Sequence, residues 1–215
     1  MAEPYGLLVA GFNYAGAAED EFHDWYDTEH VPERVRTKGF INADRWLGVD
    51  NPKVAIATYD LETLSVLQSP DYLKIGGVNL SPWSKRVSAK CERVCRFEAN
   101  QVVPGQQAAP SNAGALLLVA MNAVPEAESE FNDWYEKEHM PALSAVAGCL
   151  CARRFRMSAG THRYLALYHL TSPDVQASAA WKAAADTPWT RKIGPHIRDR
   201  LRLVLRPYDR SKDRK

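Results

Sequence analysis

The sequence predicts an α+β fold in which two ferredoxin-like βαββαβ repeats form one pseudo-dimeric α/β barrel with antiparallel sheets. Three observations lead to this prediction: an internal repeat at a constant offset, the same order of apolar and amphipathic segments in both copies, and a polar segment between the copies. At 215 residues the chain is long enough to build a hydrophobic core as one domain or as two.

The internal repeat is clearest where residues 21–46 align with residues 130–155 without a gap, at an offset of 109. The two segments are EFHDWYDTEHVPERVRTKGFINADRW and EFNDWYEKEHMPALSAVAGCLCARRF, and eleven of the 26 aligned positions are identical, which is far above chance. The same offset aligns the apolar runs before these segments, and a three-residue deletion then aligns Pro82 with Pro188. We therefore interpret the chain as an internal duplication.

The segment between the copies, NQVVPGQQAAPSNA, is rich in Gln, Pro and Ala and has no apolar periodicity, which is typical of a linker. The C-terminal end is conspicuously basic, and we expect it to be solvated and frayed. The expected units are a first ferredoxin-like repeat at 1–99, a linker at 100–113, a second ferredoxin-like repeat at 114–208 and a basic tail at 209–215.

Each copy begins with a short apolar run, GLLVAGF or GALLLVAM, which is typical of a buried strand. An acidic segment follows from about residue 18 or 126, and its early Asp and Glu residues favour a helix N-terminus. We expect Pro32 or Pro141 to stop or kink this first helix, because a proline disfavours helix at the residue before it.

The rest of each copy supplies three more strands and a second helix. Gly39 or Gly148 opens the second strand, and VAIATYDL or YLALYHL forms the third. The second helix starts near Glu62 or Ser172, and CERVCRFEA or RLRLVLRPY forms the fourth strand. A four-stranded sheet with helices on one face leaves its other face bare, so we expect each copy to cover the bare face of the other.

The composition gives no reason to expect nucleic acid or a membrane as a partner. The net charge is +1, no apolar stretch reaches the ~18 residues of a membrane span, and the N-terminus MAEPYG lacks the features of a signal peptide. We therefore expect a cytoplasmic protein. Its four cysteines match no zinc or redox spacing and are expected to be reduced core residues. No nucleotide-binding, zinc-protease or hydrolase motif occurs, and we expect no metal and no cofactor.

An acidic residue lies in the middle of the aromatic stripe of each first helix. At 100° per residue, Trp25, Tyr26 and Glu29 share one face of the first copy, while Asp27 faces water. A buried carboxylate needs a partner, and we expect Glu29 to pair with Arg45. The second copy repeats this arrangement with Trp134, Tyr135 and a Glu138–Arg154 pair. Each pair either fixes how the helix docks or also presents its arginine to an anionic or carbonyl-bearing ligand.

His30 and His139 end these helices beside Tyr26 and Tyr135. An imidazole with a pKa near neutrality can take and return a proton, and a neighbouring phenol can hydrogen-bond an enolate. The alternative is a histidine that hydrogen-bonds the backbone at a helix end. We predict His30, Tyr26, Arg45 and His139 as catalytic residues.

The remaining candidate ligand-binding residues are aromatic or amide side chains on other elements. Asn13 ends the first strand and either orients a carbonyl group or starts a turn, as does its counterpart Asn122. The glycines of KIGGVNLSPW indicate a mobile loop over a pocket mouth, which slightly favours an active pocket in the first copy. Core packing would explain Tyr59, Tyr168, Trp83 and Trp189 equally well. The predicted substrate-binding residues are Asn13, Trp25, Tyr59, Trp83, Tyr135, Arg154, Tyr168 and Trp189.

The string W-Y-x-x-E-H-x-P, followed by a Gly-initiated strand with Ala-x-Arg, resembles the dimeric α/β-barrel superfamily, within its EthD-like branch. The resemblance covers nearly the whole chain and implies the barrel fold. It does not fix the reaction, because relatives with this barrel include cyclases, isomerases, decarboxylases, monooxygenases, haem enzymes and proteins with no known activity.

Three functions remain open from the sequence. The leading hypothesis is a cofactor-independent lyase, isomerase or cyclase that acts on a small hydrophobic carbonyl compound, aromatic or polyketide-like, by histidine acid/base chemistry. The alternatives are a non-catalytic ligand-binding or accessory protein of a catabolic operon, and a haem-binding oxygenase or dehydratase. The partner is expected to be a small hydrophobic or aromatic ligand, and the protein either a pseudo-dimeric monomer or a homodimer.

Overall fold

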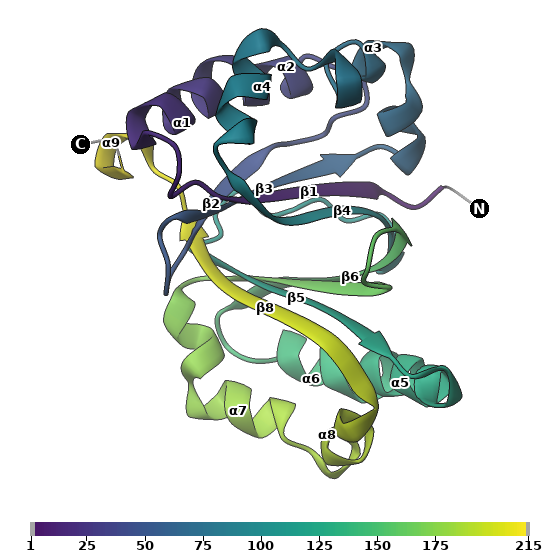
Figure 1. The fold of residues 1–215 in the computed structure, drawn as a ribbon. Helices are drawn as coiled ribbons and strands as arrows, with labels where there is room; N and C mark the ends of the chain where they lie inside the picture. Colours follow the sequence, from purple (N-terminus) through teal and green to yellow (C-terminus); the bar gives the residue numbers. More distant parts are fainter. Residues whose placement is uncertain (1–2, 214–215) are drawn as a thin grey trace.

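The computed structural model describes residues 3–213, so the first two residues of the expected first repeat and the last two of the expected tail lie outside the described residues. Eight strands form a closed barrel, and helices cover its outside in two groups on opposite sides (Figure 1). The strands are β1 (Gly6–Asn13), β2 (Asp44–Gly48), β3 (Val54–Leu61), β4 (Glu92–Val103), β5 (Ala115–Ala123), β6 (Cys149–Ala159), β7 (Tyr164–Leu170) and β8 (Ile197–Pro207).

The helices of the two halves occur in the same order relative to the strands. None of them, within the described part of the chain, is long and apolar enough to cross a membrane. The α-helices are α1 (Glu19–Trp25), α2 (Val31–Val35), α3 (Pro70–Leu73), α4 (Pro82–Ala89), α5 (Glu128–Trp134), α6 (Met140–Ser144), α7 (Ala179–Ala185), α8 (Pro188–Ile193) and α9 (Arg210–Asp213).

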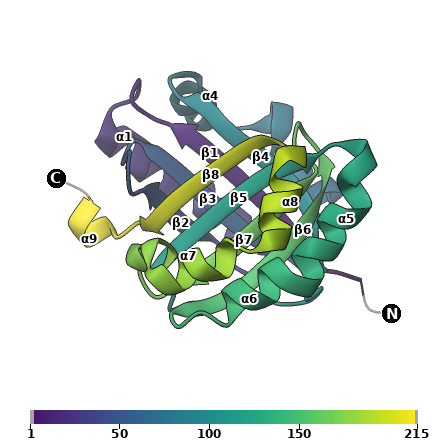
Figure 2. The ribbon, with the colours of Figure 1, turned by 90° about the horizontal axis from the view of Figure 1, so that it is seen from below.

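The barrel order is β1-β3-β2-β8-β5-β7-β6-β4, and every neighbouring pair is antiparallel. β1 to β4 belong to the first half and β5 to β8 to the second, so the halves meet along two seams, β2–β8 and β4–β6. Figure 2 shows β8 crossing the barrel beside β5 and reaching β2. The predicted fold class, two βαββαβ units in one α/β barrel, is confirmed.

Alternation along the strands separates the barrel interior from the helix-covered faces. Leu7 and Val9 of β1 belong to the same buried cluster as Leu116 and Leu118 of β5, and this cluster is the inside of the barrel. Leu8 belongs to a separate cluster beneath the helices of the first half. Side chains that face outward from the sheet therefore lie beneath the helices, which is where a cavity would face a ligand.

A π-helical turn interrupts the first helix of each half. Tyr26–His30 continues α1 and Tyr135–His139 continues α5, and the backbone N–H of Val31 donates to the carbonyl of Tyr26, five residues earlier. Of the two expected outcomes, a stop or a kink at the proline, the stop is wrong, because the helix continues through each proline. Each lies in the first turn of the following α-helix, α2 or α6, where its missing N–H is tolerated.

A buried ion pair links the two halves inside the barrel. Nη1 of Arg153 donates to Oδ1 of Asp60 at 2.7 Å, and both side chains are almost fully buried. The other carboxylate oxygen of Asp60 accepts from Nδ2 of Asn42 at 2.9 Å and from the backbone N–H of Ala109 at 2.6 Å. Residues 100–103 of the expected linker belong to β4. The rest of the linker contributes the N–H of Ala109 as a donor to this ion pair.

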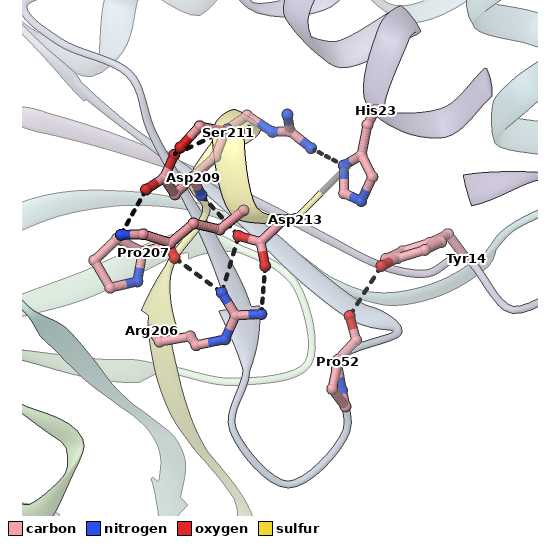
Figure 3. A network of polar contacts seen from close by, with 10 residues as sticks. Tyr14, His23, Pro52, Arg206, Pro207, Asp209, Ser211 and Asp213 are labelled. Carbon is pink, nitrogen blue, oxygen red and sulfur yellow. Dashed lines mark hydrogen bonds and ion pairs between the residues drawn. The ribbon is translucent and has the colours of Figure 1, made fainter. Parts of the chain in front are cut away.

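The C-terminal residues, expected to be frayed, are folded as far as Asp213. Arg206 donates to both carboxylate oxygens of Asp213, at 2.9 Å and 2.7 Å, and the side chain of Asp209 accepts from Ser211 at the start of α9. Figure 3 shows this network beside His23, with the hydroxyl of Tyr14 bonded nearby to the carbonyl of Pro52. Arg210 of this tail lies 3.7 Å from Asp27, so the tail packs against the first half.

Candidate functional site

Two cavities lie between the helices and the outward face of the sheet, one in each half, at equivalent positions of the repeat. The cavity of the second half has a volume of about 720 Å³ and that of the first about 210 Å³. We call them the large cavity and the small cavity. Residues at the repeat offset line both, including Trp134 and Trp25, His139 and His30, and Tyr168 and Tyr59.

Apolar and aromatic side chains form most of the wall of the large cavity. Its helical side carries Trp134 and Tyr135, and Nε1 of Trp134 donates to Oγ1 of Thr190 at 3.1 Å, which ties α5 to α8. The apolar wall residues are Leu117, Val119, Met121, Leu143, Trp181, Ala185 and Ile197.

Two polar groups with unused hydrogen-bonding capacity face this apolar wall. Nδ1 of His139 and the hydroxyl of Tyr168 are buried and have no hydrogen-bond partner among the described residues. Both residues line the large cavity. Buried polar groups are normally paired, so these two enclosed and unpaired atoms are the unusual polar feature of this wall.

Burial sets the charge state of these groups. It lowers the pKa of His139 to about 4, with a further contribution from the positive charge of Arg200. It also raises the pKa of Tyr135, and it raises that of Tyr168 well above its ordinary value, with the neighbouring Tyr135 adding to the effect. At neutral pH the imidazole and both phenols are uncharged. The expectation of a histidine pKa near neutrality is therefore wrong for His139, because burial outweighs every other influence on it.

Cationic side chains line one side of the large cavity. Arg200 and Arg202 come from β8 and Lys182 from α7, whereas Asp186, the single acidic residue of the lining, is paired with Arg191 at 2.8 Å. This excess of positive charge would attract a negatively charged group on an otherwise apolar ligand.

The small cavity holds His30, Trp25, Tyr59 and, at its mouth, Gly76 and Gly77. The two glycines lie where the sequence places a loop over a pocket. Burial, with Arg34, Arg45 and Arg93, holds the pKa of His30 well below its ordinary value, so a near-neutral pKa is wrong here too. The slight preference for an active pocket in the first half stays a prediction, although the cavity of the second half is the larger of the two.

The predicted Glu29–Arg45 and Glu138–Arg154 pairs are wrong. Arg45 instead contacts Asp27 at 2.5 Å and Nδ1 of His23 at 2.8 Å. Glu29 accepts hydrogen bonds from the hydroxyls of Ser81 and Ser84.

In the second half Arg154 contacts Glu136 at 3.2 Å and Asn132 at 2.6 Å, and Glu138 accepts from Thr187. The π-helical turn is the physical reason. With more residues per turn than an α-helix, it changes the directions of the side chains: Asp27 contacts the sheet and is only 13% exposed, whereas Glu136 contacts Arg154 and stays 52% exposed. Glu29 and Glu138 contact the second helix of their halves instead.

The predicted catalytic residues of the first half do not share one cavity. The guanidinium of Arg45 lies 4.5 Å from the ring centroid of Tyr26 and 3.9 Å from that of Tyr208. Neither Arg45 nor Tyr26 lines the small cavity with His30, and Arg154 lines neither cavity. The structure groups Tyr135, His139 and Tyr168 in one cavity and Trp25, His30 and Tyr59 in the other.

The other predicted ligand-binding residues have structural contacts. Oδ1 of Asn13 accepts from the backbone N–H of Ala15, which confirms the turn interpretation. Trp83 packs against the core of the first half, and Nε1 of Trp189 donates to Glu130 at 3.2 Å. None of these three residues lines either cavity.

Sequence reasoning missed the polar residues that distinguish the two cavities. Arg34 lines the small cavity at the position that Leu143 occupies in the large one. Comparing the two copies position by position outside the identical motif would have revealed this difference. Arg200 and Arg202 gave no such signal, because alternate charged residues on a strand are typical of a solvated face.

No group of three or more metal-ligating side chains that could hold a metal ion occurs among residues 3–213. Histidines that ligate a metal almost always donate their other ring nitrogen to an acceptor, and Nδ1 of His139 has no hydrogen-bond partner among the described residues. The ring of His139 is instead packed against that of Trp134, with centroids 4.2 Å apart.

No protein-family model matches the chain, and no curated protein matches it significantly. Solved structures do match. An anthrone oxidase-like protein has a TM-score of 0.64 at 10% identity, covering 95% of this chain and 92% of its own. A proposed monooxygenase from Fusobacterium nucleatum has a TM-score of 0.62 at 9% identity, covering 97% and 94%.

A chlorite dismutase variant from Candidatus Nitrospira defluvii matches with a TM-score of 0.59 at 11% identity, covering 99% of this chain and 94% of its own. At these identities the likeness shows the fold alone. The protein shares the fold of these structures, which in this chain is a closed eight-stranded antiparallel barrel.

Proposed function

We propose that this protein is a small-molecule enzyme whose large cavity binds a hydrophobic, enolisable carbonyl compound, aromatic or polyketide-like. The single observation that carries the proposal is that an uncharged imidazole without a hydrogen-bond partner and the phenol of Tyr168, which neighbours the phenol of Tyr135, line one largely apolar cavity of about 720 Å³. This volume is within the ~300–1,000 Å³ range of small-molecule sites.

In this proposal His139 removes a proton from the carbon next to the substrate carbonyl, and the hydroxyl of Tyr168 donates to the carbonyl oxygen. The proton moves to the imidazole and the electron pair of the C–H bond moves to the oxygen as an enolate. The low pKa of His139 disfavours protonation in the unliganded cavity. A developing enolate offsets this effect, because proton transfer then creates an ion pair rather than an isolated buried charge.

Return of the proton to another carbon would complete an isomerisation, and expulsion of a leaving group would complete an elimination. Arg200 and Arg202 would stabilise the anionic intermediate from one side of the cavity. We propose that the reaction needs no resident cofactor and that the residues assigned here act without a haem.

The test is hydrogen–deuterium exchange at the α-carbon of 2-tetralone in D₂O, followed by NMR. We expect the protein to accelerate exchange and His139→Gln to lower this acceleration by about 10²–10⁴-fold. His162→Gln is the matched control, because its ring lies outside both cavities, bonded to the backbone oxygen of Asp199. Exchange that His139→Gln leaves unchanged would contradict the proposal.

The second candidate is a non-catalytic ligand-binding protein, and the apolar wall of the same cavity favours it. It predicts that 2-tetralone raises the melting temperature with no acceleration of exchange. Haemin that formed a one-to-one complex with a sharp Soret band, lost in His139→Gln, would instead support the haem alternative.

We also propose that the two halves arose by tandem duplication within the EthD-like branch. Three features support this: the aligned motif, the matching order of elements and the π-helical turn at the same position of each half. The duplication would divide the chain as expected from sequence, with 1–99 and 114–208 as the repeated units.

A further inference from the structure

The small cavity is chemically different from its counterpart in the second half. The position equivalent to Leu143 is Arg34, whose side chain is buried, with the residue only 4% exposed. A buried guanidinium must have compensating contacts, because an uncompensated charge in the protein interior is costly. The contacts of Arg34 therefore show whether its charge is fully used within the chain.

Arg34 is only partly satisfied by the protein. Its Nη1 donates to the backbone oxygen of His30 at 2.8 Å and lies 3.6 Å from Glu33, whose carboxylate is outside the cavity lining. Its Nε and Nη2 donate no hydrogen bond among the described residues, and neither atom is fully enclosed by the protein. Both donors therefore keep some accessible surface, and Arg34 is one of the residues that line the small cavity.

Other polar atoms of the same cavity are also unpartnered. Nδ1 of His30 and the hydroxyl of Tyr59 are buried without a hydrogen-bond partner. The hydroxyl of Ser84 is already used, because it accepts from Nε1 of Trp25 at 2.9 Å and donates to Glu29 at 3.0 Å. The guanidinium of Arg34 is thus the group with free, accessible donors, which suit an acceptor-rich ligand, while an imidazole nitrogen and a phenol hydroxyl lie enclosed beside it.

The charge of the small cavity is positive. Arg93 has no ion pair among the described residues, and its guanidinium lies 4.8 Å from the ring centroid of Phe12. Arg96, which also lines the cavity, is paired with Glu98 at 2.7 Å. No aspartate or glutamate is among the described residues of the lining. A negatively charged ligand would therefore neutralise Arg34 without meeting a carboxylate in the lining.

The size and walls of the cavity define the rest of the ligand. Its 210 Å³ is about seven times the ~30 Å³ that one water molecule occupies in the liquid. Aromatic rings of Trp25, Tyr59 and Tyr72 and the apolar side chains of Leu8 and Leu80 surround this space. Arginine recognises carboxylates through two parallel N–H donors, a geometry that the free Nε and Nη2 of Arg34 offer.

We propose that the small cavity is a second binding site, for a small aromatic monocarboxylate of the size of benzoate, held by Arg34. This site is separate from the large cavity and does not depend on the reaction proposed there. In this proposal the two halves bind different ligands: the large cavity binds a carbonyl compound and the small cavity binds an acid.

The test is titration of the whole protein with benzoate, benzamide and inorganic phosphate, followed by the NMR signal of the Trp25 indole N–H and by calorimetry. We expect benzoate to bind at one site and shift this signal, with benzamide and phosphate each at least tenfold weaker. Equal binding of benzamide would overturn the role of charge, and equal binding of phosphate would overturn the assignment to a carboxylate.

Arg34→Leu, which installs the residue of the second half, is expected to weaken benzoate binding at least tenfold. Arg34→Lys keeps the charge without the two parallel donors and should also bind more weakly. If Arg34→Leu does not fold, the exposed Arg93→Gln gives a second measurement, with an expected threefold or greater loss. Unchanged affinity in Arg34→Leu, or in Arg93→Gln where that variant is needed, would overturn the proposal, as would benzoate shifts confined to Trp134 of the large cavity.

Discussion

Removing the carboxylate of Asp60 should destabilise the protein strongly, because this group is the buried counter-charge of Arg153 across the two halves. Asp60→Ala would delete the 2.7 Å ion pair and the acceptor for Asn42 and Ala109. It would leave a fully buried guanidinium whose Nε and Nη2 already have no partner among the described residues. Breaking such a pair from one side costs about 3–5 kcal/mol, and at ~2–4 °C per kcal/mol for a chain of this size the melting temperature should fall by about 6–20 °C.

Urea denaturation followed by tryptophan fluorescence measures this loss as a change in the free energy of unfolding. Asp60→Leu combined with Arg153→Met should recover most of it, because the pair is then replaced by apolar side chains rather than broken. Asp186→Ala is the matched control, since it removes an exposed partner of Arg191 and should change stability by less than about 1 kcal/mol. A loss below about 1 kcal/mol in Asp60→Ala, or a double variant as unstable as the single one, would refute the reasoning.

Three further predictions concern single side chains. Burial and Arg153 lower the pKa of His169 to about 3, so the unfolded state binds more protons than the folded state as the pH falls below 6.5, and the protein loses stability. His169→Leu should reduce the loss of unfolding free energy between neutral pH and about pH 5 by about 2 kcal/mol, measured by urea denaturation. Tyr208 stacks on His23 with ring centroids 4.6 Å apart, and its hydroxyl donates to Asp27. In thermal unfolding, Tyr208→Ala should cost about 2–3 kcal/mol and Tyr208→Phe, which loses only the hydrogen bond, about 1 kcal/mol. Equal losses in the two variants would contradict separate contributions of the ring and the hydroxyl. Gly148 has a φ of +92°, and an added Cβ would lie 2.7 Å from Cγ2 of Val175, so Gly148→Ala should lower stability by about 1–3 kcal/mol in the same assay. Gly194→Ala is the control and should leave stability unchanged, because an added Cβ there meets no atom within 4 Å.

The fold was predictable because the repeat places two weak patterns in register. A single apolar run such as GLLVAGF is ambiguous between strand and buried helix, but its counterpart at the same offset has the same neighbours. The positions of Gly39 and Gly148, both with positive φ before the second strand, were likewise evident from the aligned copies. The barrel closure followed from the bare face of each predicted sheet.

The candidate site was less predictable because a local change in helical twist moved its residues. The sequence assigned Glu29 to the inward stripe at 100° per residue, whereas the π-helical turn brings Asp27 to Arg45 instead. Nothing in the residue types of Tyr26–His30 distinguishes this turn from an α-helix. Cavity volume depends on the packing of all surrounding side chains, so the difference between the two halves could not follow from the shared motif alone.

The two seams between the halves determine what the chain between them has to do. β2 pairs with β8 and β4 pairs with β6, so backbone hydrogen bonds join the halves on both sides of the barrel without any contribution from the connection between β4 and β5. That connection supplies a donor from Ala109 and an acceptor from Gln107 to the buried Asp60–Arg153 pair, and it otherwise raises the effective concentration of one half around the other. Cleavage within 104–114 should therefore leave a nicked protein that elutes as a single species, and the chain is a natural candidate for reconstitution from two separately made fragments.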